Sequence, residues 1–264
     1  MRPDRLLRVL VTFDCARPSE DALLQLTALL EFDRLEVTGL YVEDEDLLRA
    51  ASLPGLREIS LTGVESRLDA EHVHGELARD AAAARAAFAA LTHRLIGHHQ
   101  RLTQRFDVIR GRVADALALA AADADLVVVT RTLRRSGLRP RQARAFAALA
   151  RRPATVLFVN EPWASGTSVV VIATTDDGVR QGARLAAAEG LRLGAAAPAD
   201  AALPELPPVA ALRRLPGLSE KDIADLCLAE DARLLVLPAD HRLDVAELLV
   251  TLADRLPCSV LKLA

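Results

Sequence analysis

The fold is set by one stretch, Asp123-Ala-Asp-Leu-Val-Val-Val-Thr-Arg-Thr-Leu-Arg-Arg-Ser-Gly137, which runs from a helix end through a buried strand into a basic loop. Residues 126–129 are an unbroken aliphatic run, typical of a parallel strand covered on both faces. In open α/β sheets the ligand crevice lies just past the carboxyl end of such a strand. A phosphate site made of backbone amides favours glycines there, because a Cβ would obstruct the anion. The chain instead continues with Thr130, Arg131, Thr132 and Leu133.

Strands and helices alternate on both sides of this stretch. The sequence predicts strands at 7–13, 35–42, 106–110, 126–130 and 155–160, and helices after Pro18, at about 69–101, at 113–122 and at 142–150. The acidic run at 43–46 is typical of a solvated helix start and does not have the convergent geometry of a metal site. This order predicts an α/β fold with an open, doubly wound parallel sheet.

The second half of the chain repeats this plan in shorter form. Asp231-Ala-Arg-Leu-Leu-Val-Leu237 matches the start of the opening stretch, and Leu256-Pro-Cys-Ser-Val-Leu-Lys-Leu263 matches Arg152-Pro-Ala-Thr-Val-Leu-Phe-Val159. Each half therefore ends in a strand introduced by proline. Residues 161–167 are typical of a linker. We predict two tandem Rossmann-like domains, 1–162 and 163–264, of which the second is truncated.

Two expectations concern how the halves pack. The final strands, 155–160 and 259–263, are aliphatic edges, so we expect them to face each other within one chain as a pseudo-two-fold pair. Between its second and third strands the second half has only residues 196–208, which are rich in proline and therefore do not favour a helix. One face of its sheet should therefore lack a covering helix. We expect the helical layer between Glu43 and Arg101, from this chain or from another, to shield apolar surface there, which makes a homodimer plausible.

Composition narrows the class of protein. The 264 residues carry a formal net charge of −3, which argues against a general nucleic-acid binder. The first apolar run is broken at Arg8 and Asp14, so we expect no signal peptide and no membrane span. Three cysteines without short spacing favour a reducing cytoplasm. The sequence has no nucleophile–base arrangement, no paired-histidine metal motif and no P-loop, so we expect neither an enzyme nor a metal site.

With both halves aligned, the chain resembles the universal stress protein family, and in particular its tandem-domain members. The resemblance rests on Arg8-Val-Leu-Val-Thr-Phe-Asp14, Gly111 before a helix, Ala124-Asp-Leu-Val-Val-Val129, Arg135-Ser-Gly-Leu138 and Arg152-Pro-Ala-Thr-Val-Leu-Phe-Val159. The family fold is a five-stranded parallel α/β sheet. Its ATP-binding members carry a Gly-x-x-Gly loop after the fourth strand, followed by Gly-Ser or Gly-Thr. This chain has Thr130 and Leu133 at the loop glycines and Gln142-Ala143 at the later pair, so the nucleotide signature is degenerate.

The resemblance also implies which residues form the site. Asp14 corresponds to an adenine-side aspartate, Val42 to a base-pocket valine and Gly111 to a glycine that lets ribose approach. In the second half, Thr175 or Asp176 lies near the position equivalent to the aspartate, Ser219 lies near the position equivalent to Gly111, and Pro238 takes the position equivalent to Thr130.

The residues themselves allow other roles. Asp14 could equally cap a helix or turn, and Gly111 could be a turn glycine. The arginines Arg131, Arg134 and Arg135 could hold an anion with guanidinium forks, or they could belong to a solvated loop. If a ligand binds, we expect it between the first and fourth strands of the first half, bounded by Asp14, Val42, Gly111, Thr130 and Arg131.

Three functional hypotheses follow. The leading one is a cytoplasmic, non-catalytic stress-response type module that binds ATP or AMP weakly at most and has a protein partner or homo-oligomer. The second is an ATP-binding or ATP-hydrolysing switch in which the arginine loop replaces the glycine loop. The third is a purely architectural pseudo-dimer in which the second half replaces a second subunit.

Overall fold

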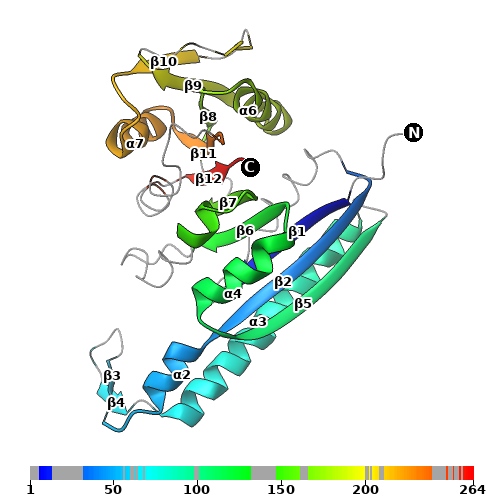
Figure 1. Ribbon diagram of the computed structural model, residues 1–264, viewed down its shortest axis with the longest axis vertical. Coiled ribbons are helices and arrows are strands. Elements are labelled where there is room, and N and C mark those ends of the chain that lie inside the picture. Colours follow the sequence, from blue (N-terminus) through cyan, green and yellow to red (C-terminus); the bar gives the residue numbers. More distant parts are fainter. Residues whose placement is uncertain are drawn as a thin grey trace.

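A computed structural model describes residues 6–13, 32–55, 57–59, 63, 65–67, 69–97, 101–131, 147–160, 166–199, 202, 204–207, 211–239, 248, 252, 256 and 258–264. Ten strands form one sheet in the order β10-β9-β8-β11-β12-β7-β6-β1-β2-β5 (Figure 1). The bounds are β1 Leu6–Phe13, β2 Arg34–Asp44, β5 Leu102–Gly111, β6 Leu126–Arg131, β7 Thr155–Asn160, β8 Ser168–Ile172, β9 Arg192–Pro198, β10 Ala211–Leu215, β11 Ala232–Leu237 and β12 Ser259–Lys262. Two further strands, β3 Arg57–Ile59 and β4 Glu65–Arg67, form a separate small sheet.

The same strand order occurs twice in the large sheet. The first half reads β5-β2-β1-β6-β7 and the second reads β10-β9-β8-β11-β12, with all neighbours within each half parallel. This confirms the predicted α/β fold with an open parallel sheet. The predicted domain boundary between residues 162 and 163 lies outside the described residues and stays a prediction.

Helices cover both faces of the sheet. Their bounds are α2 Glu45–Ala51, α3 Ala70–Ile96, α4 Val113–Ala120, the 3₁₀ turn η1 Ala121–Asp123, α6 Asp176–Glu189 and α7 Glu220–Ala229. Side chains alternate along the strands, so Val128 belongs to the core beneath α3 and α6, whereas Val127 and Val129 belong to the core beneath α4 and α7. The central strands are buried on both faces, which explains their unbroken aliphatic runs.

The two halves meet through their final strands, as predicted. β12 pairs with β7 antiparallel, and Leu261 lies directly opposite Leu157. The sequence repeat aligns these same two leucines, so a pseudo-two-fold axis passes through their pair. Lys262 adds a polar link across this junction, because its Nζ donates to the carbonyl oxygens of Arg152 at 2.5 Å and Ala154 at 3.0 Å. The single antiparallel pairing in the described large sheet therefore joins the halves into one continuous structure.

The acidic run begins a helix, as predicted. Glu43 and Asp44 end β2, and Asp44 is the N-cap of α2, where its side chain accepts a hydrogen bond from the amide of Asp46 at 2.9 Å. Glu45 and Asp46 lie in the first turn, where carboxylates interact favourably with the helix dipole.

The long predicted helix is α3, which ends at Ile96 with Gly97 as its C-cap. It lies on β2 and β5 of the first half, where Phe88 packs 6.1 Å from Phe13 and 5.5 Å from Phe106, centroid to centroid. Figure 1 shows α2 at the end of the molecule opposite the second half, and α3 running from there along β2 and β5. The expectation that this layer of the same chain shields the second half is therefore wrong, because α3 stays on the two strands that it connects. Shielding by another chain stays a prediction.

The second half also needs less cover than expected. β8 and β9 are buried on both faces by α6 and α7. The edge strand β10 is exposed, but it carries Arg213 and Arg214, which give this edge charge in place of a flat apolar face.

Candidate functional site

The predicted crevice lies where the order of strands reverses. β1 and β6 are parallel neighbours, with Val11 opposite Val128 and Thr12 opposite Val129. β2 and β5 continue to one side of β1, whereas β6 and β7 lie on the other. The carboxyl ends of β1 and β6 therefore open onto the switch point at which ligands bind in open α/β sheets.

Local hydrogen bonds fix the register of this central pair. The backbone amide of Arg8 donates to Oδ2 of Asp125 at 2.8 Å, and the amide of Asp125 donates to the carbonyl of Arg8 at 2.9 Å. At the other end, Oγ1 of Thr12 donates to the carbonyl of Val128 at 3.3 Å. Asp125 thus links the amino ends of β1 and β6, and Thr12 links the two strands again near their carboxyl ends, just before the crevice.

The structure describes only part of the predicted site. Asp14, Arg134 and Arg135 lie outside the described residues. Thr130 and Arg131 are described by their backbone alone, as the last two residues of β6. Their proposed contacts with a ligand stay predictions.

Val42 and Gly111 come together at the carboxyl edge of β2 and β5. Val42 lies opposite Ile109 and packs partly buried against the core beneath α4, and alternation along β5 places Gly111 on that same face. Gly111 does not have a positive φ, and no described atom lies within 4 Å of the position that an added Cβ would take. Backbone conformation therefore does not require this glycine, whereas open space beside it permits close approach of a ligand.

Two ion pairs stand beside Gly111, and sequence reasoning missed both. Arg110 donates from Nε and Nη2 to Oε2 of Glu43 at 3.1 and 3.0 Å. Nε of Arg112 lies 3.8 Å from Oε1 of Glu45. The signal was present, because an acidic run follows β2 and the Arg-Gly-Arg sequence ends β5, but its use required knowing that β2 and β5 are neighbours. These pairs fix the two strand ends and surround Gly111 with charge.

The corresponding edge of the second half is occupied by helix caps. Thr175 caps α6 by accepting from the amide of Gly178 at 3.2 Å, and Ser219 caps α7 by accepting from the amide of Asp222 at 3.2 Å. Pro238 packs so closely on the start of α6 that a Cβ added to Gly178 would lie 2.9 Å from it. The polar groups near the predicted positions are thus used within the fold.

Two buried groups outside the predicted site have shifted pKa values. A hydrogen bond with the Cys258 thiol, together with burial, raises the pKa of the Cys227 thiol above its ordinary value, which makes a reactive thiolate unfavourable. Burial lowers the pKa of Lys262. Among the described residues, no cluster of histidine, cysteine and carboxylate side chains could hold a metal ion. No helix in the described part of the chain is long and apolar enough to cross a bilayer.

Comparisons with known proteins address the fold. No protein-family model and no curated protein sequence matches the chain. Among solved structures, it is similar to a universal stress protein from Archaeoglobus fulgidus DSM 4304, with 12% identity, a TM-score of 0.60, and coverage of 97% of this chain and 95% of that one. It is also similar to a functionally unknown protein from Pseudomonas aeruginosa PAO1, with 14% identity, a TM-score of 0.52, and coverage of 97% and 92%. This chain therefore has the universal stress protein fold over nearly its whole length.

Proposed function

We propose that the protein is a cytoplasmic, non-catalytic binding module of the stress-response type, with at most a weak adenine-nucleotide site in its first half. The observation that supports this most strongly is that the β1 and β6 carboxyl ends meet at the same edge of the sheet as the open space beside Gly111. Asp14 would accept a hydrogen bond from an exocyclic amine or a ribose hydroxyl, and Val42 would contact the base.

The phosphate end of this site would depend on side chains. The loop after β6 has Thr130 and Leu133 where glycines would let amides surround an anion. Guanidinium groups of Arg131, Arg134 or Arg135 would take that role. Ordering each such side chain costs about 0.5–1.5 kcal/mol, so affinity should be micromolar or weaker and should fall with added salt.

The proposal does not include catalysis because the sequence has no recognisable arrangement of a nucleophile and a general base. A nucleotide-hydrolysing switch would require the arginine loop to supply both charge stabilisation and a positioned water.

A second role is favoured by the antiparallel pairing of β7 and β12. The second half would act as a built-in partner that covers an edge strand of the first half, because an unpaired aliphatic edge is a site for unwanted strand addition. A homo-oligomer of this chain would then need a surface other than its final strands.

Titration with ATP, ADP, AMP and adenosine, each at low and high salt, tests the nucleotide proposal. Asp14→Ala should abolish any binding, and Arg131→Ala should weaken ATP more than adenosine. Arg180→Ala, at an exposed arginine of α6, is the matched control and should change neither. Unchanged binding in both site variants, or crosslinking of a nucleotide analogue to residues after Gly166, would show that the site assignment is wrong.

A further inference from the structure

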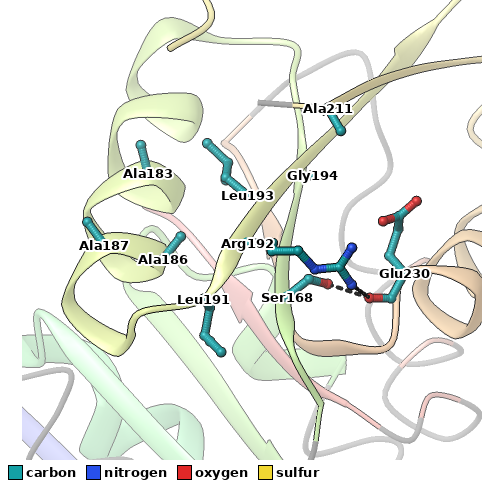
Figure 2. Close-up of a pocket in the computed structure, with 10 residues that line it drawn as sticks. All are labelled: Ser168, Ala183, Ala186, Ala187, Leu191, Arg192, Leu193, Gly194, Ala211 and Glu230. Atoms are coloured by element: carbon teal, nitrogen blue, oxygen red, sulfur yellow. Dashed lines mark hydrogen bonds between the residues drawn. The ribbon is translucent and has the colours of Figure 1, made fainter. Parts of the chain in front are cut away.

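A cavity of about 400 Å³ lies at the amino-terminal edge of the second half of the sheet (Figure 2). Its lining comes from α6, from the first residues of β8, β9 and β10, and from the C-terminal end of α7. This volume falls within the range of small-molecule sites, roughly 300–1,000 Å³. The cavity is partly open to solvent, and it lies at the opposite end of the strands from a switch-point crevice.

The truncation of the second half explains why this space exists. In the first half, β5 pairs with β2 from Leu35 onward, nearly along its full length. In the second half, the described pairing of β10 with β9 begins at Gly194, so no described strand lies on the outer side of Arg192 and Leu193. None of the described residues between β9 and β10 is helical, whereas α3 covers the equivalent position of the first half.

One wall of the cavity is apolar. Ala183 and Ala187 of α6 and Leu193 of β9 line it, and Leu191 lies at the lower end in the view of Figure 2. The two alanines leave the space open, since a larger side chain on that face of α6 would fill it. An aliphatic group placed here would exchange water for apolar contacts.

The opposite face of β9 carries a cation. The Arg192 side chain points away from α6 towards the end of α7, where its Nη2 donates to Oγ1 of Thr167 at 3.2 Å and to the carbonyl of Glu230 at 3.4 Å (Figure 2). The Glu230 carboxylate pairs instead with Arg213 at 2.7 Å. Within the described part of the chain, Arg192 thus has neutral acceptors and no carboxylate partner. Its guanidinium has further donors that suit an anion.

We propose that this cavity binds a free medium-chain aliphatic carboxylate. The chain of the ligand would lie against Ala187 and Leu193, and its carboxylate would pass around the edge of β9 that no described strand covers to meet Arg192. Arg192 also caps the carboxyl end of α7, but capping alone does not account for an apolar hollow on the other side of the same strand. The site is separate from the nucleotide crevice and does not depend on it.

Octanoate is the probe, and octylamine, with the same tail and opposite charge, is its control. Calorimetric titration and amide chemical shifts of isotope-labelled full-length protein should show octanoate binding that perturbs residues 183–194, with no comparable effect of octylamine. Arg192→Gln should weaken octanoate at least about tenfold, the loss expected for a hydrogen-bonded charge, and Arg192→Lys should retain part of the affinity. Ala187→Leu should fill the apolar wall and abolish binding without lowering the unfolding temperature.

Several results would overturn the proposal. These are no binding of octanoate to the wild-type protein, equal binding of octylamine, or unchanged affinity in Ala187→Leu. If Ala187→Leu does not fold, the wild-type chemical shifts decide. Perturbations confined to residues 183–194 and their neighbours across β8 and α7 support the site, and perturbations elsewhere contradict it.

Discussion

A double-mutant cycle across the junction of the two halves tests whether they form one cooperative sheet. Leu157 is fully buried, Leu261 is 3% exposed, and the two lie directly opposite each other in the antiparallel β7–β12 pair. Each Leu→Ala change should lower the free energy of unfolding by about 2–5 kcal/mol, from lost burial and the cavity left behind. Because the two side chains share one core beneath α3 and α6, the changes should be non-additive, with a coupling energy of about 0.5 kcal/mol or more.

The assay is urea unfolding of the wild type, both single variants and the double variant, followed by far-ultraviolet circular dichroism. The matched control is Leu157→Ala combined with Leu91→Ala, since Leu91 is equally buried but lies on α3 over the far strands of the first half. That pair should be additive within about 0.5 kcal/mol. If alanine variants do not fold, valine replacements give the same cycle with smaller effects. Additivity of the Leu157 and Leu261 changes would refute the junction.

The remaining predictions concern single positions. Gly39→Ala should destabilise the fold by about 1–3 kcal/mol in thermal unfolding, because the new Cβ would lie 2.6–2.9 Å from the rings of Phe106 and Phe88. Gly111→Ala should change stability little in the same assay, because no described atom lies near its added Cβ, but it should weaken any adenine-nucleotide binding measured by titration. Burial lowers the pKa of Lys262, so between that lowered pKa and the ordinary lysine value of ~10.4 the unfolded chain binds more protons than the folded chain. The free energy of unfolding in urea, measured relative to Lys262→Met, should therefore rise with pH through this window and fall as the pH drops through it. A difference that does not change with pH would count against a buried Lys262 with a lowered pKa. Ser219→Ala should lower the free energy of unfolding by about 0.5–2 kcal/mol through loss of the α7 cap, with no such loss for an exposed serine outside a cap.

The sequence predicted the sheet because its signals are local. An unbroken run such as residues 126–129 identifies a strand buried on both faces, and the repeat of Pro153 at Pro257 placed two aliphatic edges in equivalent positions. Because exposed aliphatic edge strands are avoided in native proteins, we predicted that these two edges pair, and β7 does pair with β12.

The side-chain partners could not be predicted, because they depend on register between distant strands. Glu43 meets Arg110 only because β2 and β5 are parallel neighbours with those two residues opposite each other. Lys262 is unexpected in an aliphatic strand, and only the structure explains it, because its Nζ donates hydrogen bonds to two carbonyl oxygens of the first half. The cavity likewise depends on the register of β10 against β9, in which Ala211 lies opposite Gly194, and composition does not reveal that register.

For α3, the helix itself was predicted correctly but the part of the sheet that it covers was predicted wrongly. A composition rich in alanine, arginine and leucine, without proline, predicted this helix correctly, but the length of its connections decides which strands it covers. With Gly97 and Leu102 so close in the chain, α3 must return directly to the strand that follows it.

The central claim, a first-half nucleotide site that is weak because it lacks a glycine loop, is tested most directly by the nucleotide content of the purified full-length protein. Acid extraction and chromatography should recover adenine nucleotide far below one molecule per chain, because a micromolar or weaker site empties during purification. ATP recovered at close to one molecule per chain would contradict the account.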